Sequence, residues 1–169
     1  MFSCKNEELI RRLKRAQFAK QKVEIFKPNI DTRYDENKVV SHDANEIRSN
    51  PVPAAANIRL LADGCDVIGI DEAQFFDDAI VDVAQKLAYR GTRVICAGLD
   101  MDFKGQPFGP MPKLLAVAES VTKLSAVCMV CGAPATRSQR MVPGQQEPNK
   151  ENTENQVLVG AHDYYEARC

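Results

Sequence analysis

Apolar side chains near the start of the chain recur with two different periods. From Lys5 to Lys22 they return at helical spacing, and basic side chains take the opposite face, which predicts an amphipathic helix. The apolar positions of this helix are Leu9, Ile10, Leu13 and Ala16. Val23 to Lys27 then reads as a short strand that Pro28 ends.

The middle of the chain has the pattern of a strand, a helix and a second strand. Val67 to Ile70 is continuously apolar, and residues 93–99 contain a second apolar run, as expected of strands covered on both faces. Between them, residues 77–90 have helical periodicity and end at Gly91. This βαβ unit predicts a parallel sheet of α/β class. We also expect helices over 55–61 and 112–119, and a long loop over 29–53 that could contain one strand.

The pattern changes near residue 120. Short strand-like runs surround Cys128 and Cys131, a polar segment rich in Pro, Asn, Glu and Gln covers 143–155, and residues 156–159 could form one more strand. We therefore expect an α/β nucleotide-binding domain over 1–120 and a small metal-binding lobe over 121–169.

Charge and composition exclude several function classes. Lys and Arg number 22 against 23 Asp and Glu, without the basic surplus of nucleic-acid or anionic-membrane binders. A zinc-ribbon nucleic-acid module is disfavoured, because the lobe has no basic cluster beyond Arg137 and Arg140. No apolar run approaches the roughly 20 residues that span a bilayer. The residues after Met1 are charged, unlike a secretion signal, so we expect a cytoplasmic protein.

Candidate catalytic residues lie at the end of an inner predicted strand and at the start of the first predicted helix. Asp71 and Glu72 follow an inner strand, at the sheet edge where α/β proteins bind ligands. In phosphoryl transfer one such acid holds Mg²⁺ and a neighbour accepts the proton of the attacking hydroxyl; an acidic, solvated turn is the alternative. Lys5 begins a predicted helix. A phosphate-loop lysine lies between a strand and a helix, and only the helix is present in this sequence, so an ordinary surface lysine remains the alternative.

Five of the six cysteines divide into two groups. Cys65 and Cys96 lie in or beside apolar stretches, where a free thiol behaves as a small hydrophobic side chain. Cys128 and Cys131 form a C-x-x-C motif, and Cys169 is a further candidate ligand. In a cytoplasmic protein this spacing favours a metal over a disulfide.

Five motifs together carry a family resemblance. They are M-F-S-x-K-x-E-E-L-I-R-R at 1–12, D-T-R-Y at 31–34, D-E-A-Q-F-F at 71–76, G-L-D at 98–100 with P-F-G at 107–109, and the C-x-x-C with Y-E-A-R-C at 165–169. In this order and spacing, the set closely resembles the type II thymidine kinases. The resemblance implies a P-loop NTPase-like parallel sheet with helices on both faces and a zinc-binding β lobe, assembled as a homotetramer.

The resemblance also implies a reaction and a set of roles. ATP, with Mg²⁺, would transfer its γ-phosphoryl group to the 5′-hydroxyl of thymidine. Glu72 would be the general base, and Arg33 would offset charge that develops during transfer. The residues expected to bind the nucleotide and its metal are Ser3, Lys5, Asn6, Asp31, Asp71 and Gln74.

Later segments would supply the thymidine pocket and a structural zinc site. Apolar side chains would surround the base, although core packing is the alternative for each phenylalanine, and Tyr165 would belong to a lasso-like loop over the nucleoside. The expected pocket residues are Leu99, Phe103, Phe108, Ser138 and Tyr165. Zn²⁺ would be held by Cys128, Cys131 and Cys169. The family continues with a further Cys or His, so a fourth ligand is missing here, and His162 is a possible substitute.

Three departures from the family pattern bear on activity. The strand and first glycine of the phosphate loop are absent before Met1, Cys4 replaces the second glycine, and Asn6 replaces Ser or Thr. Relative to the family pattern, we expect the sequence to be truncated at both ends. If the native chain begins at Met1, we expect weak ATP binding and little turnover. The alternative function is a non-catalytic nucleoside-binding or interaction protein.

Overall fold

The computed structural model describes residues 3–29, 38–40, 46–141 and 165–169. The chain forms two compact units, each of which is described by itself. The sheet unit comprises Lys5–Asp100 and Phe108–Val121. The cysteine unit comprises Met1–Cys4, Met101–Pro107 and Thr122–Cys169.

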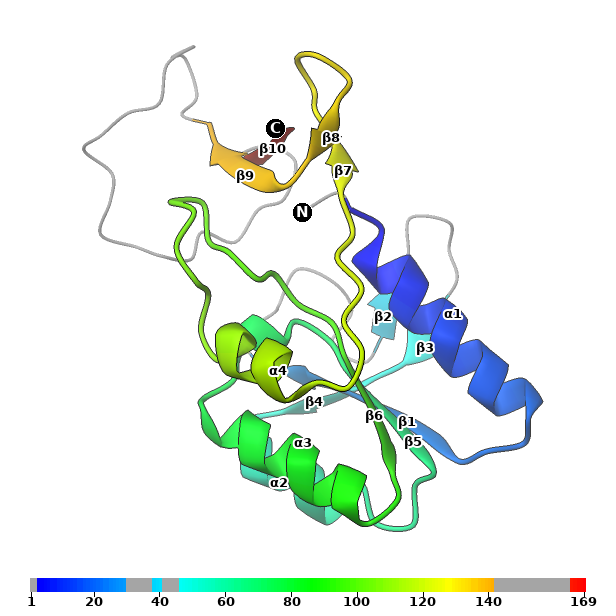
Figure 1. The fold of residues 1–169 in the computed structure, drawn as a ribbon. Coiled ribbons are helices and arrows are strands. Elements are labelled where there is room, and N and C mark those ends of the chain that lie inside the picture. The colour runs from blue at the N-terminus through cyan, green and yellow to red at the C-terminus, as the bar shows by residue number, and fades with distance from the viewer. Residues whose placement is uncertain (1–2, 30–37, 41–45, 142–164) are drawn as a thin grey trace. The chain divides into compact units, whose positions relative to one another are not determined.

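The sheet unit is built on four parallel strands (Figure 1). Their bounds are β1 (Val23–Pro28), β4 (Asn50–Val52), β5 (Val67–Ile70) and β6 (Arg93–Cys96). The order across the sheet is β4-β1-β5-β6, and every neighbouring pair is parallel. The predicted α/β class with a parallel sheet is therefore confirmed. The inner position of β5 means that the residues following it lie at the middle of the carboxyl edge of the sheet.

Helices cover both faces of this sheet (Figure 1). On one face, α1 (Lys5–Phe18) packs Leu9 and Leu13 with Val67 in one apolar cluster. The other face carries Ile68 in a larger cluster with residues of α2 (Ala55–Leu61), α3 (Ala79–Tyr89) and α4 (Met111–Val117). A Cβ at Gly69 would lie 2.7 Å from Leu13 Cδ1, so a glycine in β5 allows α1 to pack closely against the sheet.

The first helix ends earlier than its apolar pattern predicts, at Phe18 rather than Lys22. Lys20 adopts a left-handed backbone with φ of +57°. Its N–H donates to Gln17 O (2.8 Å) and the N–H of Gln21 donates to Ala16 O (3.1 Å), which is a Schellman termination. A lysine takes the position that glycine usually occupies at the end of a helix. The sequence therefore contained no glycine from which the end of α1 could be predicted.

The predicted loop over 29–53 contains more strand than expected, because one strand was anticipated there and the described residues form three. Its described parts hold β2 (Lys38–Val40) and β3 (Glu46–Arg48), which pair antiparallel, and also β4. Each has three residues, too few for a two-residue alternation to be visible. Pro51 lies within β4 and is tolerated because β4 is an edge strand with one neighbour.

The cysteine unit consists of two small antiparallel pairs. β7 (Ala126–Val127) pairs with β8 (Pro134–Ala135), and β9 (Arg137–Arg140) pairs with β10 (Tyr165–Arg168). Its core is small and consists of Ala126, Cys128, Ala135 and Ala167. The segments predicted as a loop over 143–155 and a strand over 156–159 lie outside the described residues. Within the described ranges, no helix combines the length and apolar character needed to cross a membrane.

Candidate active site

The acidic pair follows β5 in an unusual backbone conformation. Asp71 is buried, its N–H donates to Phe26 O of β1 (2.9 Å), and its Oδ1 accepts the N–H of Glu72 (2.9 Å). Glu72 has a left-handed backbone, with φ of +49° and ψ of +42°. Such a conformation costs on the order of 1 kcal/mol in a residue with a Cβ and persists where surrounding contacts enforce it. The backbone of Glu72 is thus held in this conformation at the carboxyl edge of the sheet.

Lys5, at the first turn of α1, reaches this acidic pair. Its Nζ lies 2.6 Å from Glu72 Oε1 and 3.7 Å from Asp71 Oδ1, and it donates to Asn6 Oδ1 at 2.8 Å. The three carboxylate and amide oxygens therefore converge on one ammonium group. Oxygen ligands of this kind also suit Mg²⁺, so the residues present fit the metal that a phosphoryl-transfer site requires.

Gln74 lies in the short 3-10 helix η1 (Ala73–Phe75) and is 3% exposed. Its Nε2 donates to Glu72 Oε2 (2.6 Å), and its Oε1 accepts the N–H of Leu99 (3.0 Å), which follows β6. The ends of β5 and β6 are also joined by the N–H of Ala73, which donates to Ala97 O (2.9 Å). The side chain of Gln74 therefore connects the acidic pair to the segment after β6.

Two of the predicted pocket residues belong to the same unit as Glu72. Leu99 is half-buried, and Phe108 is buried and packs edge-to-face on Phe75, with ring centroids 5.5 Å apart. Gly109 has φ of +49°, and a Cβ there would overlap the backbone oxygen of Gln74. Phe75 was missed by the sequence analysis. Its signal was its place in D-E-A-Q-F-F, directly after Gln74.

The other three predicted pocket residues belong to the cysteine unit. The guanidinium of Arg140 lies over the ring of Phe103, with 5.1 Å between Arg140 Cζ and the ring centroid. In the β9–β10 pair, Tyr165 is opposite Arg140 and Ala167 is opposite Ser138, so Ser138 and Tyr165 share one face. Arg140 was also missed, because no sequence spacing relates it to Phe103.

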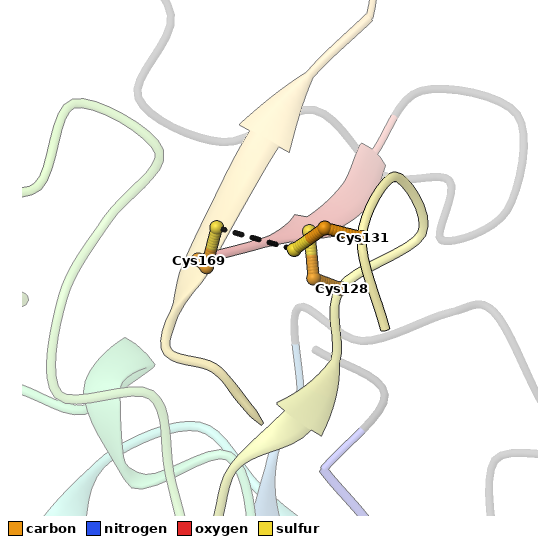
Figure 2. A group of neighbouring side chains, drawn as sticks. All are labelled: Cys128, Cys131 and Cys169. Atoms are coloured by element: carbon orange, nitrogen blue, oxygen red, sulfur yellow. Dashed lines mark hydrogen bonds between the residues drawn. The ribbon is translucent and has the colours of Figure 1, made fainter. Parts of the chain in front are cut away.

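The three candidate metal ligands come together in the cysteine unit (Figure 2). The Sγ atoms of Cys128, Cys131 and Cys169 all lie within 4.8 Å of one another, and Cys131 Sγ is 3.8 Å from Cys169 Sγ. Tetrahedral zinc with Zn–S bonds near 2.3 Å requires sulfur atoms about 3.8 Å apart. The thiol cluster therefore fits a structural zinc ion.

The protonation of these thiols differs with their surroundings. Backbone hydrogen bonds from Cys131, Val130 and Cys169 lower the pKa of Cys128 to about 6, whereas hydrogen bonding to the neighbouring sulfur atoms raises the pKa of Cys169. Burial raises the pKa of Cys96 to about 12, and burial also raises the pKa of Cys65. Both of these last thiols pack in the core of the sheet unit, as predicted.

Several predicted positions remain separate from this network. Asp31, Arg33 and His162 lie outside the described residues. Ser3 is described and lies at a bend before Cys4, which has a left-handed backbone with φ of +56°. A cavity of about 280 Å³ in the sheet unit is lined by residues such as Asp66 and Thr92, which precede β5 and β6, and so lies at the edge opposite Glu72.

Comparison with known proteins gives one consistent answer. The family model for thymidine kinase matches residues 1–169. A thymidine kinase from Rhodothermus sp. (strain ITI 518) is 59% identical over all 169 residues, which align with 75% of that protein. A thymidine kinase from Porphyromonas gingivalis (strain ATCC BAA-308 / W83) is 58% identical over the same span, which aligns with 78% of it. The predicted resemblance is confirmed, and the chain belongs to the thymidine kinase family.

Proposed function

We propose that this protein transfers the γ-phosphoryl group of ATP to the 5′-hydroxyl of thymidine. The single observation that carries the proposal is the convergence of Lys5, Asp71 and Glu72 at the carboxyl edge of the sheet. A cation for phosphate, an acid for the metal and a second acid for the hydroxyl proton are the groups that phosphoryl transfer needs. Membership of the thymidine kinase family supports the choice of substrates.

Glu72 is the proposed general base. As the 5′-oxygen forms its bond to the γ-phosphorus, the bond from that phosphorus to the bridging oxygen of ADP breaks, and the hydroxyl proton passes to the Glu72 carboxylate. Arg33 is proposed to offset the charge that develops on the transferring group, by its place in the D-T-R-Y motif.

Lys5 is the proposed phosphate ligand, and its contacts set a condition on binding. Its ammonium donates to Asn6 and is paired with Glu72, so ATP phosphates must compete with that carboxylate for it. Asp71 and Asn6 would hold Mg²⁺, which neutralises phosphate charge when bound. Ser3 and Asp31 complete the proposed nucleotide-site set, whereas Gln74, which the resemblance also places there, contacts Glu72 and the backbone of Leu99.

The thymidine pocket is proposed to use Leu99, Phe103, Phe108, Ser138 and Tyr165. The edge-to-face pair of Phe108 with Phe75 adds a second aromatic wall in the sheet unit. In the cysteine unit, Ser138 and Tyr165 offer hydroxyl groups from one face of the β9–β10 pair. Enclosure of the nucleoside would keep water from competing for the γ-phosphate.

Cys128, Cys131 and Cys169 are proposed to hold structural Zn²⁺, on the sulfur spacing described above. The functional division is proposed as a nucleotide-binding domain over 1–120 and a zinc-binding lobe over 121–169. All six cysteines are free thiols, which supports the reducing cytoplasm as the location.

A homotetramer is proposed from the family resemblance. Large apolar side chains on the helices of the sheet unit support self-association, since Phe18 is 83% exposed and Tyr89 is 85% exposed. Light scattering on the purified chain would give a mass of four times 18.8 kDa if the proposal holds.

The function is tested by incubating the protein with ATP, Mg²⁺ and thymidine and detecting dTMP by mass spectrometry. Deoxycytidine and deoxyguanosine serve as control acceptors. Formation of dTMP alone supports the proposal. Thymidine binding without turnover, measured by calorimetry, would instead support the non-catalytic alternative, for which Cys4 and Asn6 in the phosphate loop are the motivating residues.

A further inference from the structure

Gln74 joins two parts of the site through the two ends of its amide group. Its nitrogen donates to Glu72 Oε2 (2.6 Å) and its oxygen accepts the N–H of Leu99 (3.0 Å). We propose that Gln74 is a positioning residue that fixes the Glu72 carboxylate relative to the segment after β6. This inference rests on the proposed role of Glu72 as the base, and it assigns Gln74 a task other than nucleotide contact.

The fold reserves space for this amide. A Cβ at Gly98 would lie 2.8 Å from Gln74 Oε1, and a Cβ at Gly109 would overlap the backbone oxygen of Gln74. Gly98 follows β6 and Gly109 precedes α4, so two separate segments approach Gln74 without side chains. The burial of Gln74 (3% exposed) makes both of its hydrogen bonds costly to lose, because a buried amide without partners loses its solvation.

The geometry at Glu72 explains why such a restraint is useful. Three groups of the described network face or adjoin its carboxylate: the Lys5 ammonium, the Gln74 amide and the Asp71 carboxylate, which shares the Lys5 contact. When Lys5 engages phosphate, Oε1 becomes the oxygen that can accept the hydroxyl proton. The amide on Oε2 carries no charge and holds no removable proton at neutral pH, so it can keep the carboxylate oriented through the transfer.

The amide oxygen of Gln74 also holds a second group, the backbone N–H of Leu99. Leu99 is a proposed wall of the thymidine pocket, and its backbone N–H is fixed by Gln74 Oε1. The base and this wall are therefore held by the same side chain. Gln74→Met removes both hydrogen bonds, whereas Gln74→Glu keeps an oxygen for Leu99 and loses the donor to Glu72.

The experiment is steady-state kinetics of thymidine phosphorylation by the full chain. For Gln74→Met we expect kcat to fall roughly 10- to 100-fold, with the KM for ATP changed less than about twofold. The acid limb of the kcat–pH profile should move to higher pH, because a hydrogen bond that stabilises the ionised carboxylate is lost. Gln74→Glu should lower kcat as well, while only Gln74→Met raises the KM for thymidine.

Two further variants separate positioning from general damage. Gln85→Met changes a half-buried glutamine of α3 outside this network and should leave kcat and its pH profile unchanged. Gly98→Ala leaves Gln74 in place but crowds its amide and the Met111 side chain, because the added Cβ would lie 2.8 Å from both Gln74 Oε1 and Met111 Sδ. It should reproduce the kcat loss and the pH shift. Gly98→Ala keeps the test decisive if Gln74→Met fails to fold.

An unchanged kcat and pH profile in folded Gln74→Met would overturn the proposal. A raised KM for ATP with unchanged kcat would overturn it too, since Gln74 would then be a nucleotide ligand. If instead Glu72 is not the general base, the Glu72→Gln variant would retain turnover. If Glu72→Gln is inactive and Gln74→Met is normal, only the positioning role is wrong.

Discussion

Lys5 and Glu72, 67 residues apart in the chain, form an ion pair with 2.6 Å between Nζ and Oε1. Their side chains are 17% and 13% exposed, so the pair is shielded from water. Lys5 begins α1 and Glu72 follows β5, and these elements pack together through Leu13 and Gly69. Close packing of a helix on an inner strand thus brings Lys5, the proposed phosphate ligand, to Glu72, the proposed base.

Replacing Lys5 should impair both ATP use and stability. Lys5→Met removes a cation aimed at charge that develops on the phosphate, and kcat/KM for ATP should fall about 10²- to 10³-fold. The acids at 71 and 72 lose a cationic partner, so the free energy of unfolding should fall by about 1–3 kcal/mol. Urea denaturation and ATP-dependent kinetics measure both effects. Lys86→Met, at an exposed position of α3, is the control, and equal behaviour of the two variants would contradict the assignment.

Restoring glycine at position 4 should improve nucleotide binding. Cys4 has φ of +56°, a conformation that costs a side-chain-bearing residue about 1–2 kcal/mol, and in the family pattern its place belongs to a glycine that leaves room for the phosphates. Cys4→Gly should lower the dissociation constant for ATP, measured by calorimetry. Lys20→Gly relieves the same backbone conformation (φ of +57°) at the end of α1 and should leave ATP binding unchanged. Weaker ATP binding by Cys4→Gly would refute this interpretation.

Gly109 should be far less tolerant of a methyl group than Gly91, although both have positive φ. An added Cβ at Gly91 meets nothing within 4 Å, whereas at Gly109 it overlaps the backbone oxygen of Gln74. Gly91→Ala should cost about 1–2 kcal/mol from backbone conformation alone. Gly109→Ala should cost about 1–3 kcal/mol more through overpacking, and should also lower kcat by shifting Gln74. Equal unfolding free energies would show that the crowding at Gly109 relaxes freely.

Zinc should be retained at neutral pH and released by acid. The pKa of Cys128 is lowered from 9.0 to about 6, so the thiolate contributes fully to the stability of the folded lobe above pH 9. This contribution is lost as the pH falls through about 6. Because zinc binds the thiolate form, protons compete with the metal for the sulfur atoms and acid weakens zinc binding. Metal analysis after dialysis at pH 7.5 should find about one zinc per chain, and dialysis at pH 5 should remove it.

Cys131→Ser is the matched test of the same site, and Cys65→Ser, a core thiol, is its control. Only the first variant should lose zinc at pH 7.5. Zinc retained by Cys131→Ser, or absent from the freshly purified wild-type protein under reducing conditions, would contradict the assignment.

The parts of the fold that could be predicted are those marked by a pattern within a few consecutive residues, such as an apolar run or a glycine at the end of a helix. Val67–Ile70 is apolar throughout because β5 is covered on both faces, and Gly91 ends α3 with φ of +91°. The end of α1 had no such signal, because Lys20 takes the left-handed conformation that usually marks a glycine. Strand β4 was hidden by Pro51 and its short length, and it forms because β1 offers it a parallel edge.

The candidate site shows the same division. The acids at the end of β5 could be placed from sequence because carboxyl ends of parallel strands share an edge. The hydrogen bond between Gln74 and the N–H of Leu99 could not be predicted, because these residues are 25 apart in the sequence and come close only when β6 pairs with β5. Arg140 stacks on Phe103 for a similar reason, since that contact depends on the folding of the cysteine unit.

The most direct measurement is the initial rate of dTMP formation from ATP and thymidine by wild-type protein and by Glu72→Gln. This substitution keeps the volume of the side chain and removes its ability to accept a proton, so the rate should fall about 10²- to 10⁴-fold. Thymidine affinity, measured in parallel, should change little. Wild-type turnover that survives Glu72→Gln would contradict the account.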